Sequence, residues 1–353
     1  MRMDHVPRLI FWELTKECNL RCLHCRAEAE SSSFEGELSL EEVLRIIDEI
    51  ASHYRPILVL TGGEPLYRKD IYRIASHARE RGLKAALATN GTLIDAGAAA
   101  MIRDSGIQRV SISIDGGDAA SHDGFRGIPG SFDGALNGAA HLKAAGVEFQ
   151  INTTISRRNV DRIEDILKLA ETIGAKALLL FMLVPVGCGI EIAESEMITK
   201  ERYESVLNWF YDKSRETKLE LKATCAPHYY RIIRQRARQE GRKLSFETDG
   251  MAAVTRGCLA GTGVCFISHR GDVQPCGYLP VSAGNVLNRP FHEIWEDSDL
   301  FRSLRDLDNL TGKCGMCEYN TICAGCRARA YYDSGDYLSD EPYCAYLPVK
   351  TRC

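Results

Sequence analysis

The sequence predicts an α/β protein with a parallel sheet, followed by a smaller cysteine-rich region. Over the first two-thirds of its 353 residues, short apolar runs alternate with amphipathic patterns of helical period. This alternation is typical of βαβ units, in which right-handed crossovers join parallel strands. From about residue 251 cysteines and glycines become dense, and helical periodicity is lost until residue 291.

Six predicted strands precede the cysteine-rich region. They are apolar runs at residues 9–14, 57–60, 84–88, 109–114, 148–154 and 177–183. The first helix begins after Ser39, because Ser39 and Glu42 have the spacing of a capping box. Further helices are predicted at residues 69–81, 95–105, 132–145 and 160–173. Six βα units are too few for a full eight-stranded barrel.

The later part of the chain predicts a bridge and a second domain. Residues 199–241 have helical patterns and are expected to connect the two domains. Within the cysteine-rich part, residues 266–269 and 273–275 flank a short turn and predict a hairpin. Residues 291–304 predict a helix. The expected divisions are therefore a barrel domain at 1–220, a bridging segment at 221–257 and an auxiliary domain at 258–353.

Composition limits the class of protein. The hydrophobic fraction of 45% and the charged fraction of 26% are ordinary for a globular chain. A formal net charge of −4 argues against a nucleic-acid partner, and no signal peptide or membrane span is evident. We therefore expect a cytoplasmic protein. Its fourteen cysteines are many for that compartment, where disulfides are rare, so their role is expected to be ligation.

Cys18, Cys22 and Cys25 form a C-x3-C-x2-C triplet directly after the first predicted strand. Three thiolates on one loop can ligate three irons of a [4Fe–4S] cluster and leave the fourth iron open to a cofactor. Zinc is the alternative, but structural zinc sites usually have four protein ligands. The triplet therefore favours an open iron–sulfur cluster.

The triplet and the Gly62-Gly63-Glu64-Pro65 segment at the end of the next strand resemble the radical S-adenosylmethionine (SAM) enzymes. The resemblance implies a partial (β/α)6 TIM-like barrel and an open iron that binds SAM, which is cleaved to a 5′-deoxyadenosyl radical. It assigns Gly62, Gly63, Glu64 and Pro65 to the SAM amino group. It also implies that the following residues contact SAM: Asn90, Ser113, Asn152 and Arg126, with His24 against the adenine.

The later cysteines resemble the SPASM/twitch extension of the same enzymes. The resemblance implies one closed [4Fe–4S] cluster, with ligands Cys314, Cys317, Cys323 and Cys344. It also allows a second set, Cys258, Cys265, Cys276 and Cys326, although the last pair has C-x2-C spacing where the full pattern has C-x3-C. A zinc ribbon remains the alternative for these paired cysteines.

Residues 7–29, 222–232, 257–285 and 314–348 resemble the radical SAM proteins of tetrapyrrole (haem) biosynthesis. This implies removal of two acetate side chains from 12,18-didecarboxysirohaem to give Fe-coproporphyrin III, with a reductant such as ferredoxin or flavodoxin. The alternatives are propionate removal in haem d1 biosynthesis, Fe-coproporphyrin decarboxylation, and peptide or protein modification. A non-catalytic iron–sulfur carrier or zinc scaffold is the alternative of another class. No catalytic residue is assigned beyond the cluster ligands. Cys188 is expected near the barrel mouth, and His228 could ligate a haem iron.

Overall fold

The computed structural model describes residues 5–32 and 35–349. Its single ten-stranded sheet has the order β10-β9-β8-β1-β2-β3-β4-β5-β6-β7. The strands are β1 (Leu9–Glu13), β2 (Ile57–Thr61), β3 (Lys84–Thr89), β4 (Ile107–Ser113), β5 (Phe149–Ile155), β6 (Ala177–Met182), β7 (Glu220–Thr224), β8 (Val264–Ile267), β9 (Asp272–Gln274) and β10 (Gly284–Asn285). All pairs from β8 to β7 are parallel, whereas β8–β9 and β9–β10 are antiparallel. Because β10 and β7 stand at opposite ends of this order, the barrel is open.

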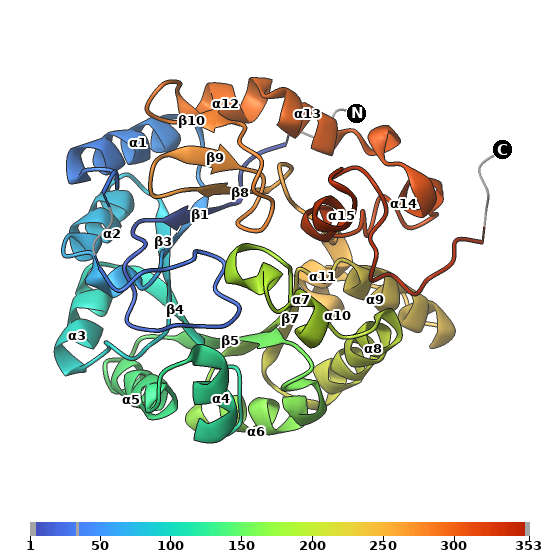
Figure 1. Ribbon diagram of the computed structural model, residues 1–353, viewed down its shortest axis with the longest axis horizontal. Helices are drawn as coiled ribbons and strands as arrows, with labels where there is room; N and C mark the ends of the chain where they lie inside the picture. The colour runs from blue at the N-terminus through green and yellow to red at the C-terminus, as the bar shows by residue number, and fades with distance from the viewer. Residues whose placement is uncertain (1–4, 33–34, 350–353) are drawn as a thin grey trace.

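Helices surround the outer face of this curved sheet (Figure 1). Those of the barrel are α1 (Leu40–His53), α2 (Ile71–Glu80), α3 (Ala96–Asp104), α4 (Ala119–Arg126), α5 (Ser131–Ala144), α6 (Ile163–Ile173), α7 (Ala193–Glu196) and α8 (Lys200–Glu216). Those that follow are α9 (His228–Gln239), α10 (Phe246–Asp249), α11 (Met251–Val254), α12 (Phe291–Asp297), α13 (Asp299–Arg305), α14 (Gly312–Met316) and α15 (Arg327–Ser334). Short 3₁₀ helices are η1 (Pro65–Tyr67), η2 (Val160–Arg162), η3 (Gly187–Ile190) and η4 (Leu307–Asn309).

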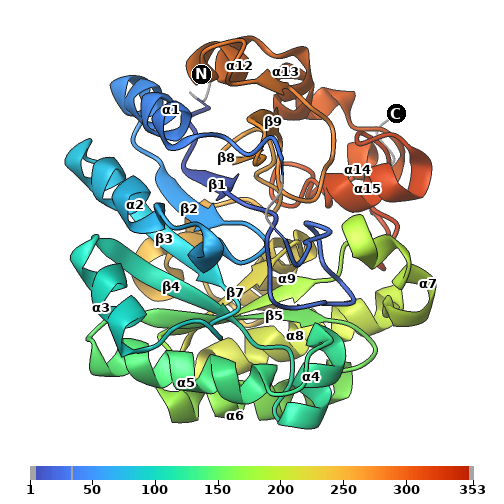
Figure 2. The ribbon, with the colours of Figure 1, turned by 60° about the vertical axis from the view of Figure 1, so that its left-hand side comes forward.

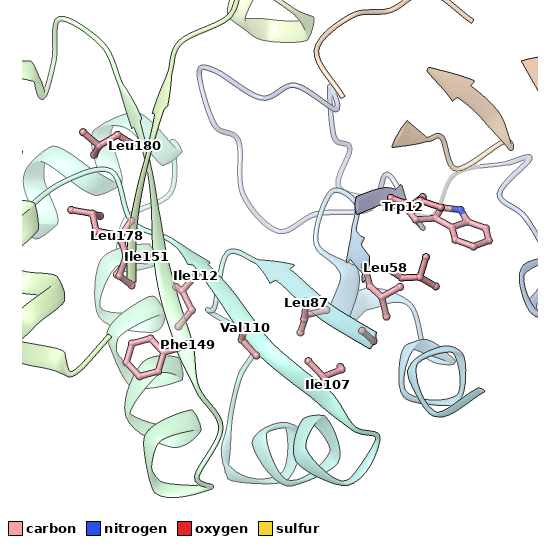
Figure 3. Close-up of a cluster of buried hydrophobic side chains, with 14 of the residues drawn as sticks. Trp12, Leu58, Leu87, Ile107, Val110, Ile112, Phe149, Ile151, Leu178 and Leu180 are labelled. Atoms are coloured by element: carbon pink, nitrogen blue, oxygen red, sulfur yellow. The ribbon is translucent and has the colours of Figure 1, made fainter. Parts of the chain in front are cut away.

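The core lies between the strands and these outer helices. Alternate strand residues, from Trp12 in β1 to Leu180 in β6, point into it and are buried (Figure 3). α1 turns its buried residues Val43, Ile47 and Ile50 toward the same core. Its start follows the expected pattern, since Ser39 and Glu42 form both hydrogen bonds of a capping box. Because each helix buries one face against the sheet, the helices hold the strands in place. The carboxyl ends of the strands remain available for a site.

The six predicted strands are present, and the fold class is confirmed. The prediction missed α4 and β7; β7 falls inside the segment that had been expected to be helical. Residues 291–304 form two helices, because extended backbone at Ser298 separates α12 from α13. The hairpin prediction is confirmed by β8 and β9.

The loop between β1 and α1 crosses the open end of the barrel (Figures 1 and 2). β8 pairs with β1, so the cysteine-rich region continues the barrel sheet beside this loop. In the part of the chain that the structure describes, no helix combines the length and the apolar character that crossing a bilayer requires.

Candidate active site

A cavity opens where the barrel strands reach their carboxyl ends. Its wall combines the β1–α1 loop with residues at or just beyond the ends of β2, β3, β4, β5 and β6. Cys18, Cys22 and Cys25 all line it. The sequence had placed the triplet and the strand-end polar residues at one mouth, and the structure brings them together there.

Each sulfur of the triplet accepts a hydrogen bond from the chain. Leu20 N–H donates to Cys18 Sγ at 3.4 Å, and Ala29 N–H donates to Cys25 Sγ at 3.4 Å. Cys22 Sγ accepts from the Arg126 guanidinium at 3.6 Å. Burial is the main reason that the pKa of Cys18 is raised to about 12. Hydrogen bonds of this kind stabilise thiolates, so the donor set fits the ligation of a cluster.

The two glycines of the Gly62–Pro65 segment permit close contact with the cysteine loop. A Cβ on Gly63 would lie 2.5 Å from the Glu17 carbonyl oxygen, and one on Gly62 would lie 2.5 Å from that of Thr15. Gly63 N–H and Glu64 N–H donate to the same two carbonyls, both at 2.7 Å. The segment therefore clamps the loop that carries the cysteines.

Glu64 itself does not line the cavity, contrary to the role expected from the sequence. Its carboxylate is fully buried and accepts from Thr89 Oγ1 at 2.8 Å and Asn90 N–H at 2.8 Å. Burial raises the pKa of Glu64 to about 7. Pro65 is also absent from the cavity wall, whereas Gly62 and Gly63 belong to it. Glu64 thus joins β2 to the end of β3 from behind the site.

Substituting Gly63→Ala is expected to cost about 1–3 kcal/mol of stability, as other overpacking changes do, because the new methyl meets backbone atoms that cannot rotate away. Urea denaturation of the two proteins measures this loss. Gly124→Ala is the matched control: its added methyl, on α4, has no neighbour within 4 Å. An equal loss in both variants would contradict the clamp.

The other expected SAM-contact residues all reach the cavity wall. Asn90, Ser113, Asn152 and Arg126 line it. Asn90 Nδ2 donates to Asn19 Oδ1 at 2.9 Å and lies 3.9 Å from Cys18 Sγ. Asn90 is therefore held beside the cysteine loop by its own hydrogen bonds.

Arg126 is already paired. Its guanidinium lies 2.7 Å from the buried carboxylate of Asp115, which also lies 3.5 Å from His24 Nε2 and accepts from Thr154 N–H at 2.7 Å. Burial lowers the pKa of His24 to about 4, and its ring stacks on Phe125 at 4.0 Å. Because Arg126 pairs with Asp115 and donates to Cys22 Sγ, it is better placed to support the cysteine loop than to bind the carboxylate of SAM. Cys188 contacts this loop through its backbone, donating to Cys25 O at 2.9 Å, but is not part of the cavity wall.

A second cavity is lined by the first expected auxiliary set. Cys314, Cys317, Cys323 and Cys344 surround it. Cys314 Sγ accepts from Glu341 N–H at 3.4 Å, and Cys317 Sγ accepts from Tyr319 N–H at 3.4 Å. Arg327 lies 3.7 Å from Cys314 Sγ. Four cysteines around one cavity, with hydrogen-bond donors to Cys314 and Cys317, fit a closed cluster.

The second auxiliary set contains Cys225 where the sequence predicted Cys265. Burial and then the neighbouring thiols Cys326, Cys276 and Cys258 raise the pKa of Cys225 well above its usual range. Cys225 and Cys276 pack against the small buried cluster that contains Cys326. Cys265 lies elsewhere: it is fully buried on β8 opposite Ile10 and belongs to the main core. The structure thus groups Cys225, Cys258, Cys276 and Cys326.

Local backbone geometry accounts for how the cysteines divide between the two sets. Ala324 (φ 60°) and Gly325 (φ 61°) are left-handed, so the chain reverses between Cys323 and Cys326 and sends them to different sets. Cys225 is also left-handed (φ 53°), which is uncommon for a non-glycine residue. Its carbonyl accepts from Tyr203 OH at 2.9 Å and Arg329 Nη2 at 2.7 Å. The sequence contained no comparable signal, because Cys225 stands alone between a strand and a helix.

An ion pair links the two four-cysteine sets. Arg329 and Glu341 are both fully buried and meet at 2.9 Å. Glu341 also accepts from Cys326 N–H at 2.7 Å, while its own N–H donates to Cys314. The guanidinium lowers the pKa of Glu341 to about 2 despite burial. The pair therefore holds the sets in a fixed relation.

Glu341→Gln is expected to destabilise the protein by about 3–5 kcal/mol, because it leaves the buried Arg329 charge without its partner. Denaturant unfolding measures the loss. The control is Asp104→Asn in the exposed Arg103–Asp104 pair, where solvent screens the charges and no measurable loss of stability is expected. A double variant, Arg329→Met with Glu341→Leu, should recover part of the loss; no recovery would contradict the charge explanation.

Tyr278 connects the first cavity to the Cys225 set. It lines the cavity at the barrel mouth, and its neighbours include Cys225, Cys276 and Cys326. Burial raises its pKa above the usual range, so it is a neutral phenol at neutral pH. No motif in the sequence distinguishes this tyrosine from the other thirteen.

Comparison with known proteins identifies the class. Residues 12–170 match the radical SAM superfamily, and residues 258–327 match SPASM, an iron–sulfur cluster-binding domain. SuiB from Streptococcus suis, solved with S-adenosylmethionine, has the same fold, with a TM-score of 0.76 at 17% identity over 97% of this chain and 78% of its own. The match to an iron–sulfur domain favours clusters over a zinc ribbon.

Sequence relatives narrow the assignment. The chain is 53% identical to the AdoMet-dependent heme synthase of Methanosarcina barkeri over 99% of both chains. It is 52% identical to that of Nitratidesulfovibrio vulgaris, over 98% of this chain and 94% of the relative. The Fe-coproporphyrin III synthase of M. barkeri is 32% identical over 95% of this chain and 87% of its own. The chain belongs to the radical SAM superfamily, in the family of these relatives, and is an enzyme that uses SAM and [4Fe–4S] clusters.

Proposed function

We propose that this enzyme is an AdoMet-dependent heme synthase that oxidatively decarboxylates two propionates of Fe-coproporphyrin III to vinyl groups. The observation that carries the proposal is the identity of 53% and 52% to two proteins of that name, against 32% to an Fe-coproporphyrin III synthase. The sequence had ranked acetate removal first and Fe-coproporphyrin decarboxylation among the alternatives. The relatives favour decarboxylation of Fe-coproporphyrin III over acetate removal.

Cys18, Cys22 and Cys25 would hold the cluster that binds SAM, and Gly62, Gly63, Asn90, Ser113 and Asn152 would contact SAM in the same cavity. Bound there, SAM and the cluster would supply a 5′-deoxyadenosyl radical, which would accept a hydrogen atom from the substrate. Arg126 and Asp115 orient the cysteine loop from behind. Glu64 fixes the end of β3 without touching the cavity.

For each propionate the chemistry removes one hydrogen atom, one electron and CO2. A hydrogen atom leaves the carbon next to the ring, the bond to the carboxylate breaks, and the remaining electron must leave the substrate. Arg26 is the best candidate to hold a propionate: it lines the cavity, and its side chain is 21% exposed. Glu13 at 2.7 Å and the ring of Phe266 at 4.5 Å keep its guanidinium in place.

Two auxiliary clusters are proposed, one held by Cys314, Cys317, Cys323 and Cys344 and one held by Cys225, Cys258, Cys276 and Cys326. Such clusters supply one-electron redox chemistry, and an auxiliary cluster would accept the electron that each propionate must lose. Tyr278 supports this role for the second set, since it borders both the cavity and those cysteines. A ferredoxin or flavodoxin is the proposed reductant, and the tetrapyrrole is the small-molecule partner.

The test is anaerobic incubation of the loaded enzyme with SAM, reductant and either Fe-coproporphyrin III or 12,18-didecarboxysirohaem, followed by mass spectrometry. Compared as neutral acids, Fe-coproporphyrin III should lose two CO2, the two abstracted hydrogen atoms and the two carboxyl protons and become haem, while the sirohaem derivative stays unchanged. Conversion of the sirohaem derivative alone would restore acetate removal as the function.

A further inference from the structure

His228 has an environment that the proposed reaction does not explain. It begins α9, and its side chain is completely buried. Neither ring nitrogen has a hydrogen-bond partner among residues 5–32 and 35–349. Its ring packs edge-on against Tyr203 at 4.9 Å. Burying an imidazole without a partner costs free energy, so two orphaned nitrogens point to a ligand.

The cavity beside His228 identifies the class of that ligand. His228 lines the same cavity as Cys314, Cys317, Cys323 and Cys344. It is absent from the wall of the barrel-mouth cavity, so the sequence-based expectation that it ligates a haem iron does not fit. A closed cluster with four cysteine ligands needs no fifth one, and its sulfurs only accept hydrogen bonds.

The charges that face His228 favour a neutral ring with one N–H donor. Burial lowers its pKa to about 3, and the cations Arg329, Arg231 and Lys313 act in the same direction, opposed by Glu341. The ring therefore keeps one donor and one acceptor at neutral pH. Only the donor can interact favourably with a cluster sulfur.

We propose that His228 donates an N–H hydrogen bond to a sulfur of the cluster held by Cys314, Cys317, Cys323 and Cys344, and thereby raises its reduction potential. A donor stabilises the more negative, reduced state of a cluster, so the direction follows from electrostatics. His228 is thus a positioning and tuning residue for one auxiliary cluster. The inference rests on the proposed assignment of that cluster.

The test compares His228→Leu, which removes the donor, with His228→Gln, which retains an N–H group. Iron and sulfide content is measured for each loaded full-length protein, and every cluster's potential is measured by titration followed by electron paramagnetic resonance. We expect full iron content and a lower potential for one auxiliary cluster in His228→Leu, with a smaller shift in His228→Gln. His77→Leu, on α2 and paired with Asp48, is the control and should shift nothing.

Pulsed resonance of protein labelled with ¹⁵N-histidine gives a second readout. A weak coupling to one histidine nitrogen is expected in the wild type and should vanish in His228→Gln. Unchanged potentials in a fully loaded His228→Leu protein, or a strong coupling typical of a direct ligand, would overturn the inference. A wild-type protein without this auxiliary cluster would overturn the cofactor assignment as well, so the two failures are distinguishable.

Discussion

Replacing Cys18, Cys22 and Cys25 together by alanine is expected to remove one [4Fe–4S] cluster and to lower haem formation at least about a hundredfold. Loss of a residue that only hydrogen-bonds to a metal ligand already lowers metal affinity or activity about 10–100-fold. Here the ligands themselves are lost. All three cysteines line one cavity, and their sulfurs accept hydrogen bonds that suit thiolates. Iron and sulfide analysis, together with the yield of 5′-deoxyadenosine, measures both losses.

Cys188→Ala is the matched control for the triplet. It lies against the same loop, but its contact is a backbone hydrogen bond to Cys25 O, and its side chain is outside the cavity wall. This variant should retain its iron and its 5′-deoxyadenosine formation. If the triple variant kept the wild-type iron content, the assignment of the triplet would be wrong.

Cys225→Ala is expected to remove a second cluster, about four iron atoms per chain, whereas Cys265→Ala should retain all of them. The two cysteines are both buried, yet only Cys225 neighbours Cys258, Cys276 and Cys326. Cys265 packs in the core of the sheet, so its loss should cost stability without costing iron. Haem formation should fall steeply in the first variant and stay near the wild-type rate in the second.

Iron analysis of the two single variants decides between the alternative ligand sets. Loss of iron in Cys265→Ala with full iron in Cys225→Ala would restore the set expected from the sequence. Full iron in both would leave one auxiliary cluster, held by Cys314 and its partners.

The sequence was sufficient for the features that depend on local patterns. Strand runs, the capping box at Ser39 and the cysteine triplet are each read from neighbouring residues, and the strands and capping box are present as expected. Asn90 and Ser113, at the ends of β3 and β4, meet Asn152 of β5 at one cavity because the parallel strands open onto the same mouth.

Features that depend on tertiary packing could not be read in this way. Cys225 joins its set only because left-handed backbone and the Arg329 contact turn it toward residues more than thirty positions away. Cys265 looked equivalent to Cys258 until strand pairing turned its side chain into the core. Glu64 appeared available to a ligand, but the end of β3 already occupies its carboxylate.

The most direct measurement follows the hydrogen atom that the reaction removes. Fe-coproporphyrin III deuterated at the propionate carbons next to the ring is incubated anaerobically with the enzyme, SAM and reductant. The proposed function predicts haem as product, two molecules of 5′-deoxyadenosine per haem, and one deuterium in each. Haem-free reaction mixtures, or 5′-deoxyadenosine without deuterium, would contradict it.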